Sequence, residues 1–595
     1  MTTSRSKAAL GALALALGGG AALAAGQQQT PESLLPPGFG DPVAPAPAPT
    51  PTASPDQPPA PGTPPAVVTT QPGVVLPTPT PTATEPPEPV DLSKYELPAY
   101  ARRSLAQVGT VGTAGGGVAP GAFGATGGRA VETWMRRLDA PVPSRWLSIA
   151  LRRALLSRID TPDDVNGADF AAERAWLLLR MGEAGGARAV VQAVDVEDYT
   201  PKLLQVAMQA MLANGDPAGL CPLVETARRL SYDRGWRFAQ PICTALAGKP
   251  AEAKAQFAAA RRGIGRTIDT LLAEKVVGAA GQGGAVTIDE AEWGGADRLT
   301  AWRYGLAAAT GVKLPDTLLA AGAPWVQAWR ATQPMQSPAA RMIAADYAAS
   351  QGVLSNLALV DLYGALDGDD DATSAQTALA RDLRSAYAEG TQADRLGVMR
   401  RLWSEPGASP RARYARLVLT ARAATGIAPN AERAEDAPRL IAAMLSAGLD
   451  RQAARWQPHV AAGSDGWAML QLADPRGRLV GAGEVEGYAG GDRRKGQMLL
   501  AGLAGLGRMS DGDAQGLART LEVPVGAQNS WTRAIRAAAA RGDGGTVLLL
   551  FALGMQTGDW RGVPPAMLYH GCAALRAVGM EGEARMIAAE AIARL

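Results

Sequence analysis

One stretch of the chain decides the expected fold: residues 180–255 read RMGEAGGARAVVQAVDVEDYTPKLLQVAMQAMLANGDPAGLCPLVETARRLSYDRGWRFAQPICTALAGKPAEAKA. Three glycines recur in it every 33 residues, at Gly182, Gly215 and Gly248. Each glycine follows an apolar segment with helical spacing and precedes another such segment. A period of this length, with a turn and two helices in each unit, is typical of α-helical repeat proteins. The stretch therefore predicts a helical-repeat architecture, and by itself it indicates no activity.

Signals for helix starts and helix ends recur along the rest of the chain. Four dipeptides place a side-chain oxygen that can cap a helix before a proline suited to the first helical position: Thr200-Pro201, Asp216-Pro217, Ser337-Pro338 and Ser409-Pro410. Turns like the one at Gly182 return at Gly448 and Gly579, each with Ala five positions later. We therefore predict an all-α fold, an α-solenoid of tetratricopeptide-like helix pairs. An irregular helical bundle is the alternative.

The composition favours helices and limits the classes of partner. Hydrophobic residues make up 47% of the chain and aromatic residues only 5%, and much of the apolar content is Ala. Such segments favour helix over sheet, so the two strand-like runs at residues 276–277 and 546–551 are expected inside helices. The net charge of +2 gives no reason to expect nucleic acid or an acidic partner. Three cysteines and two histidines are too few for a zinc cluster of the usual spacing.

Residues 1–25 have the pattern of a secretory signal peptide. Arg5 and Lys7 precede an Ala/Leu/Gly run over residues 8–25, and the tripeptide at residues 22–24, Ala-Leu-Ala, fits a small-x-small cleavage site. The alternative is an uncleaved segment that anchors the chain to the inner membrane, which would be its only membrane contact. Export and an Ala-rich composition typical of GC-rich genomes predict the periplasm of a Gram-negative bacterium.

Composition divides the chain into a leader and a body. Residues 26–98 form a Pro/Ala/Thr-rich tract in which proline prevents a packed core, so we expect a disordered linker. Residues 99–128 are expected to form a second, Gly-rich flexible linker, with one short helix over residues 92–108 between the two flexible stretches. The helical-repeat body is expected over residues 129–430 and continues in a C-terminal part over residues 431–595.

Cys221 and Cys243 are expected to form a disulfide. Cys221 lies one turn into the helix expected to start at Asp216-Pro217, Cys243 lies one turn before Gly248, and a turn near residues 232–235 divides them almost evenly. In an antiparallel helix pair, residues equidistant from the turn face each other, and export supplies an oxidising compartment. The alternative is a pair of buried thiols.

No catalytic, cofactor-binding or metal-binding residues are predicted. His570 and Cys572 lie two positions apart, which on a helix points them to different faces. Cys572 is expected to be a buried core thiol. The tetrapeptide at residues 463–466, Gly-Ser-Asp-Gly, lacks the first glycine of a nucleophile elbow. Asp367, Asp369 and Asp371 alternate as in a calcium loop, but Ala372 and Ala378 occupy its glycine and glutamate positions, so a solvated turn is expected.

Two further groups of residues suggest binding surfaces. Six arginines make the first helices basic and could dock an anionic envelope polymer, although a solvated face with internal ion pairs is the simpler interpretation: Arg136, Arg137, Arg145, Arg152, Arg153 and Arg158. Trp325 and Trp329 share a helix face and could stack on a sugar, but large aromatic residues in an Ala-rich solenoid more often fill the core.

The layout as a whole resembles exported alphaproteobacterial helical-repeat proteins of uncharacterised activity. The similarity rests on the signal, the Pro/Thr leader and the Ala-rich helical body with residues 176–182, WLLLRMG. Some such proteins carry an antifreeze-glycopeptide label. The leader has the Ala/Thr/Pro composition of those glycopeptides but lacks their strict tripeptide repeat, and ice binding is not expected. The superhelix also resembles soluble lytic transglycosylases, but the only Glu-Ser of the chain, the pair their general acid would need, is Glu32-Ser33 in the leader.

These observations favour a non-enzymatic periplasmic scaffold or adaptor of the cell envelope. It is expected to bind an envelope protein partner through the concave face of a helical array, without a cofactor and without nucleic acid. The first alternative is a non-catalytic protein that binds peptidoglycan or another envelope polymer through the Arg-rich and Trp-bearing helices. The second alternative is an enzyme of unrecognised type.

Overall fold

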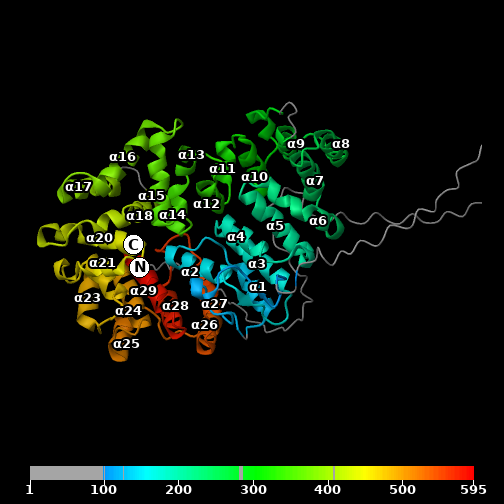
Figure 1. Cartoon of the computed structure of the whole chain (residues 1–595). Coiled ribbons are helices and arrows are strands. Elements are labelled where there is room, and N and C mark those ends of the chain that lie inside the picture. Colours follow the sequence, from blue (N-terminus) through cyan, green and yellow to red (C-terminus); the bar gives the residue numbers. More distant parts are fainter. Residues whose placement is uncertain (1–97, 99–100, 125, 281–285, 406–408) are drawn as a thin grey trace, which may run out of the picture.

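The computed structural model of the protein describes residues 98, 101–124, 126–280, 286–405 and 409–595. Within these residues the fold is all-α, as predicted, with 29 α-helices and one sheet of two short strands (Figure 1). No helix in this part of the chain is both long and apolar enough to cross a bilayer. The predicted signal peptide at residues 1–25 and the predicted linker at residues 26–98, apart from Pro98, lie outside the described residues.

The first half of the body contains seventeen α-helices. They are α1 (Gly128–Arg137), α2 (Arg145–Leu156), α3 (Gly167–Arg180), α4 (Ala184–Val191), α5 (Pro201–Ala213), α6 (Val224–Leu230), α7 (Arg234–Leu246), α8 (Pro250–Ala260), α9 (Ile268–Ala280), α10 (Ala301–Thr310), α11 (Asp316–Ala321), α12 (Trp325–Thr332), α13 (Pro338–Met342), α14 (Ala345–Gln351), α15 (Asn356–Gly364), α16 (Ser374–Ala388) and α17 (Gln392–Trp403).

The second half contains twelve more. They are α18 (Pro410–Leu419), α19 (Ala421–Thr425), α20 (Ala437–Ser446), α21 (Asp450–Ala454), α22 (Asp465–Ala473), α23 (Ala482–Gly491), α24 (Arg493–Gly505), α25 (Asp511–Thr520), α26 (Ser530–Arg541), α27 (Gly544–Gly554), α28 (Pro565–Ala577) and α29 (Glu581–Arg594). Short 3₁₀ helices and two strands complete the described elements: η2 (Thr113–Gly115), η3 (Val196–Asp198), η4 (Pro217–Leu223), η5 (Glu290–Trp293), η6 (Ala365–Gly368), η7 (Ala431–Asp436), η8 (Gln457–His459), and the antiparallel pair β1 (Gln107–Val108) and β2 (Ile159–Asp160).

The evenly spaced glycines end helices, as the sequence predicts. Gly182, Gly215 and Gly248 have φ values of 85°, 65° and 78°, the left-handed region in which glycine is strongly favoured. After Gly182, the N–H of the next residue donates to the carbonyl of Leu178 at 2.9 Å, which satisfies one of the carbonyls left open at the end of α3. The four predicted serine, threonine and aspartate caps also begin helices, each with its proline in the first turn.

Consecutive helices pack in the manner of a helical array. At nine places along the described chain a helix contacts both of the next two helices, which also contact each other, for example α3, α4 and α5; α7, α8 and α9; and α20, α21 and α22. Neighbouring elements therefore bury each other's apolar faces along the chain, which is the local packing on which our helical-repeat interpretation rests. Helices on the two sides of residue 430 pack together as well, because α20 contacts both α18 and α19.

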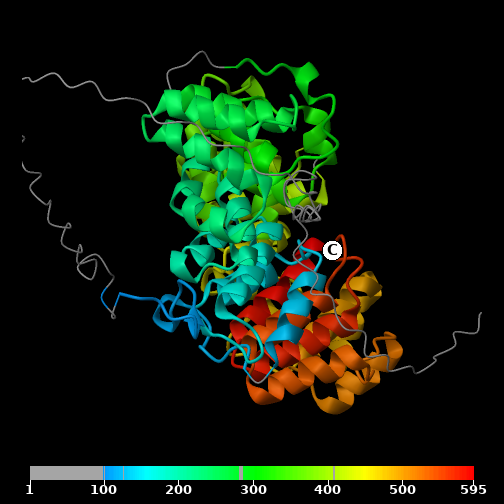
Figure 2. The same ribbon diagram turned by 90° about the vertical axis from the view of Figure 1, so that its right-hand side faces the viewer.

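The end of the chain packs against its beginning. Helix α2 contacts α27 and α29, and α1 contacts α27, so the C-terminal helices lie beside the first helices in both views (Figure 1, Figure 2). At the N-terminus of α2, the buried carboxylate of Glu590 from α29 accepts hydrogen bonds from the Ser144 hydroxyl at 2.6 Å and from the backbone N–H groups of Arg145 at 2.8 Å and Trp146 at 3.1 Å. A carboxylate at this position satisfies open N–H groups and complements the helix dipole.

The opposite end of α2 receives a positive charge. The fully buried guanidinium of Arg174, from α3, donates to the carbonyls of Leu155 at 2.9 Å, Ser157 at 2.7 Å and Val108 at 2.9 Å. Burial lowers the pKa of Arg174 to about 9. Helix α2 is thus held at both ends by side chains from other helices whose charges match its dipole.

The predicted Gly-rich linker packs on the body instead of extending freely. Phe123 is 1% exposed, its ring centroid lies 6.0 Å from that of Phe170, and the Ala122 carbonyl accepts the backbone N–H of Gly545 at 2.9 Å. A Cβ atom at Gly109 would lie 2.1 Å from the carbonyl oxygen of Ser157. The glycines therefore permit close backbone contact, and the prediction of a flexible stretch from composition alone was wrong for the described residues.

The helix expected over residues 92–108 was also wrong in its described part. Residues 101–106 are not helical, and Gln107 and Val108 form β1, paired with Asp160 and Ile159 of β2. These residues find backbone partners beyond the end of α2, which a local pattern could not indicate.

Candidate functional site

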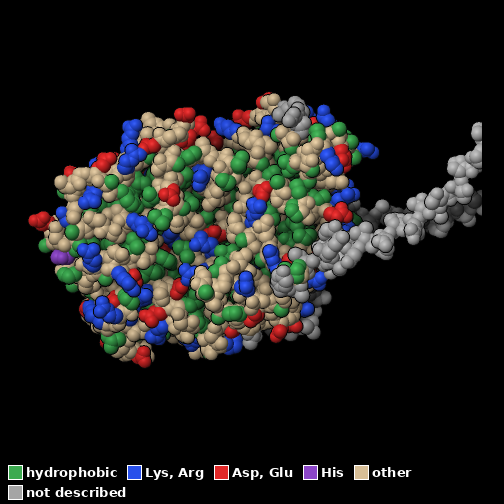
Figure 3. Space-filling model, viewed as in Figure 1, with side chains coloured by type: hydrophobic (Ala, Val, Ile, Leu, Met, Phe, Trp, Pro, Cys, Tyr) green, Lys and Arg blue, Asp and Glu red, His purple; other side chains and the backbone are tan. Residues whose placement is uncertain are grey.

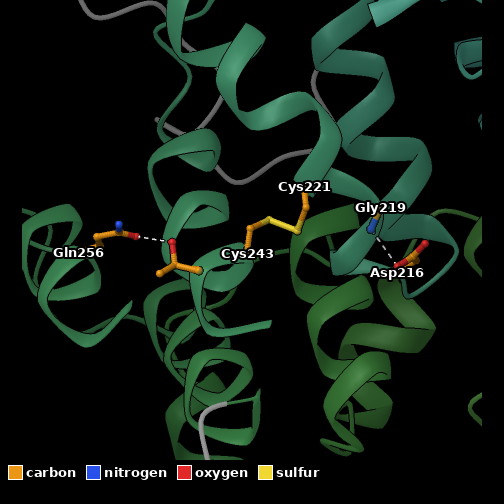
Figure 4. The surroundings of a disulfide bond; sticks show 6 residues. Asp216, Gly219, Cys221, Cys243 and Gln256 are labelled. Atoms are coloured by element: carbon orange, nitrogen blue, oxygen red, sulfur yellow. Dashed lines mark hydrogen bonds between the residues drawn. A yellow bond between two sulfur atoms is a disulfide. The ribbon is translucent and has the colours of Figure 1, made fainter. Parts of the chain in front are cut away.

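Cys221 and Cys243 are joined in the structure, as the sequence predicts. Their Sγ atoms are 2.06 Å apart and their Cα atoms 5.4 Å apart, and the bridge ties η4 to α7 (Figure 4). The first of these elements is not the α-helix that was expected at Asp216-Pro217. It is a 3₁₀ helix that passes into α6, since Pro222 inside it has no N–H to donate. The bridge therefore fixes the element before α6 onto the helix after it.

A groove opens beside this bridge, and we name it the α7–α8 groove. Its volume is about 380 Å³, within the range of ligand sites. It is lined by the end of α6, the turn after it, one face of α7 and one face of α8: Arg228, Ser231, Tyr232, Asp233, Trp236, Arg237, Gln240, Gln256, Ala259 and Ala260. On α7 the lining positions are 236, 237 and 240, and on α8 they are 256, 259 and 260, so each helix contributes a stripe with helical spacing.

The groove combines a buried aromatic floor with an exposed aromatic residue. Trp236 is 1% exposed, whereas Tyr232 in the turn is 74% exposed. Leu230 and Leu246, near the two ends of the same helical hairpin, are 44% and 46% exposed. Seven large hydrophobic side chains are exposed in the described part of the chain, and three of them therefore lie within residues 230–246. Leu230 and Tyr232 lie at the turn before α7, whereas Leu246 lies at the far end of that helix, and neighbouring exposed apolar residues such as the first two are typical of interaction surfaces.

The stretch of chain that lines the groove is rich in basic residues. Residues 221–262 contain eight Lys or Arg against three Asp or Glu, a net charge of +5, whereas the whole chain carries +2. Arg229 is paired with Glu225 and Arg261 with Glu274, but the lining residues Arg228 and Arg237 have no ion-pair partner among the described residues. The buried carboxylate in the lining, Asp233, accepts the backbone N–H of Gly235 at 2.8 Å and so caps the start of α7.

Most of the arginines considered for polymer binding are engaged inside the fold. Arg136 pairs with Glu132 at 3.6 Å and with the buried Glu173, Arg152 pairs with Glu183 at 2.7 Å, and Arg153 pairs with Glu583 at 3.0 Å. Arg145 is 3% exposed and donates to the carbonyls of Leu354 and Ser446. Arg137 and Arg158 are exposed. On the face of the molecule in Figure 3, basic and acidic side chains are interspersed and form no continuous basic surface.

The paired tryptophans do not form an exposed platform. Trp329 is 1% exposed, donates its indole N–H to the Leu179 carbonyl at 3.2 Å, and packs against the Tyr304 ring with centroids 5.6 Å apart. Trp325 is partly buried against the same core. Trp329 is therefore a core residue that joins α12 to α3 and α10.

His570 and Cys572 face different neighbours. The buried His570 lies against the rings of Trp531 and Tyr569, and burial lowers its pKa to about 4. Cys572 is fully buried with its Sγ atom 3.7 Å from the Ala584 carbonyl, and burial raises the pKa of its thiol to about 12. A neutral thiol without a base beside it is a poor nucleophile, which agrees with the predicted core role.

The remaining motif residues have structural partners. Asp369 accepts the backbone N–H of Ala339 at 2.6 Å, and Asp367 pairs with Arg384. Ser464 caps α22, and His459 lies in η8. Within the described residues, no group of three or more His, Cys, Asp or Glu side chains could hold a metal ion.

Sequence reasoning identified the hairpin and its bridge but missed the groove. The sequence pattern at residues 232–235 predicts only a turn. A signal was present in the sequence, because Arg228 and Arg229 precede Tyr232 and Arg234 and Arg237 follow it. No family model, curated protein or solved structure matches this chain.

Proposed function

We propose that the chain is a non-enzymatic scaffold or adaptor of the bacterial cell envelope, exported to the periplasm, that binds a protein partner at the α7–α8 groove. One observation carries the proposal. The groove combines an exposed tyrosine, a tryptophan floor and two arginines that have no ion-pair partner among the described residues, all within a single helical hairpin. Tyrosine, tryptophan and arginine are the residues that contribute most binding energy at protein interfaces.

The surrounding fold supports this role by making the groove rigid. The disulfide fixes η4 to α7, and α7, α8 and α9 all contact one another. A preorganised surface loses less conformational entropy when it binds, so more of the contact energy appears as affinity.

Site-specific crosslinking tests the proposal. A photoreactive amino acid replaces Tyr232 in the full chain in cells, and the matched control carries it at Leu479, which is 66% exposed on another part of the body. We expect one or two envelope proteins to crosslink at position 232 and not at position 479. Equal crosslinking at both positions, or wall polymer alone at position 232, would contradict the proposal.

A further inference from the structure

We infer that the α7–α8 groove selects an extended, acidic peptide segment, with carboxylates at Arg228 and Arg237 and an apolar side chain or proline over Tyr232. This inference rests on the proposed function and specifies the chemistry of the partner. It also differs from the expectation drawn from whole-chain charge, because a net charge of +2 conceals a local charge of +5 in residues 221–262.

Charge complementarity predicts that the ligand is negatively charged. Arg228 and Arg237 are exposed and lack ion-pair partners among the described residues, so a ligand carboxylate need not displace an existing pair. A guanidinium binds a carboxylate through parallel N–H donors, which gives strength and orientation. The surrounding positive charge of the hairpin would also attract an acidic segment before contact.

The neutral part of the lining favours a peptide over a polyanionic polymer. Of the ten lining residues, two are arginines and one is an aspartate, and the other seven are uncharged. A polymer with a negative charge on every unit binds most tightly to a continuous strip of cationic side chains, which this lining does not provide. The tryptophan floor, the exposed tyrosine and the side-chain amide of Gln240 instead match a segment that alternates carboxylates with apolar residues and exposes its backbone.

Binding by synthetic peptides tests this chemistry. The probe is a fluorescein-labelled decapeptide, Gly-Glu-Pro-Leu-Glu-Pro-Leu-Glu-Pro-Gly, and its matched control has Gln in place of every Glu. Fluorescence anisotropy with the full chain is expected to show binding of the acidic peptide and binding of the control at least about tenfold weaker, since a charge-assisted contact is worth about 1.5 kcal/mol or more. Raising the salt concentration is expected to narrow that difference.

Variants locate the contact. The double variant R228Q/R237Q is expected to weaken the acidic peptide about tenfold or more. The double variant R519Q/R533Q, which changes two exposed arginines of α25 and α26, is expected to leave it unchanged. Three results would overturn the inference: equal affinity for both peptides, no binding of either peptide, or an equal loss of affinity for the acidic peptide in both double variants. Tighter groove-dependent binding of polyphosphate would also overturn it, since the groove would then select a polyanion.

The outcomes separate this inference from the proposed function. An envelope protein that crosslinks at position 232 with equal yield in wild type and R228Q/R237Q would overturn the acidic ligand and leave the adaptor function standing. Groove-dependent binding of the acidic peptide, with no protein crosslinked at position 232 in cells, would support the ligand chemistry and contradict the adaptor function.

Discussion

Replacing Glu590 with Gln should weaken the packing of the last helix, α29, against α2 near the start of the body; we call this contact the closure. Glu590 is 3% exposed and accepts four hydrogen bonds, from Ser144, the backbone of Arg145 and Trp146, and Arg594 at 2.9 Å. The amide keeps the shape but supplies one acceptor oxygen in place of two. It therefore orphans a buried N–H at the start of α2, which costs about 1–3 kcal/mol, and it removes the charge that faces the helix dipole, which costs up to about 1 kcal/mol more.

We expect E590Q to lower the free energy of local opening between α29 and α2 by about 3 kcal/mol. The matched control is E583Q, on the same helix: Glu583 also pairs with an arginine of α2, Arg153, but both side chains are partly exposed, at 24% and 42%. That surface pair should contribute less than about 1 kcal/mol. Hydrogen exchange of the α2 and α29 amides measures the local opening free energy without assuming that the whole array unfolds in one step. A difference of less than about 0.5 kcal/mol between the two variants would refute this account of the closure.

Three further predictions concern the hairpin, the N-terminal segment and pH. The double variant C221S/C243S should destabilise the hairpin by about 3 kcal/mol, because the bridge closes a loop with a sequence separation of 22. Amide hydrogen exchange over residues 217–246 should therefore become faster, and unchanged exchange would show that the bridge is dispensable. G167A should lower the free energy of unfolding by at least about 2 kcal/mol, because the new Cβ atom would lie 2.1 Å from the carbonyl oxygen of Leu105. The control G483A, in open space on α23, should leave the free energy of unfolding unchanged or raise it by up to about 1 kcal/mol. Urea titrations measure both variants, and similar effects of the two would contradict the packing described. Burial lowers the pKa of His570 to about 4, so protonation favours the unfolded chain, and the free energy of unfolding should fall as pH drops from 6.5 to 4. H570N should flatten that part of the pH profile, and an unchanged profile would contradict the assignment to His570.

The local structure was predictable because short sequence signals determine it. The 33-residue glycine spacing gave the helix ends at Gly182, Gly215 and Gly248, and the capping dipeptides gave helix starts. The distances of Cys221 and Cys243 from the intervening turn were sufficient to pair them. Each inference needed only residues close in sequence.

The long-range structure was not predictable from the same signals. The bond between Ser144 and Glu590 joins residues 446 positions apart, and nothing local marks Glu590 as a cap for α2. The packed segment around Phe123 was mistaken for a flexible linker because glycines that permit close packing have the same composition as glycines that permit motion. The groove was missed because its lining residues come from three consecutive elements, and only the folded hairpin brings their stripes together.

The most direct test of the central claim is in-cell crosslinking of a C-terminally tagged chain, followed by affinity purification and quantitative mass spectrometry. Wild type is compared with the charge-reversal variant R228E/R237E, after circular dichroism has established that both are folded. We predict that one or two envelope proteins copurify with wild type at near-stoichiometric yield and are lost from the variant. Recovery of the same proteins with both chains, or of wall fragments alone, would contradict binding of a protein partner through Arg228 and Arg237 of the α7–α8 groove.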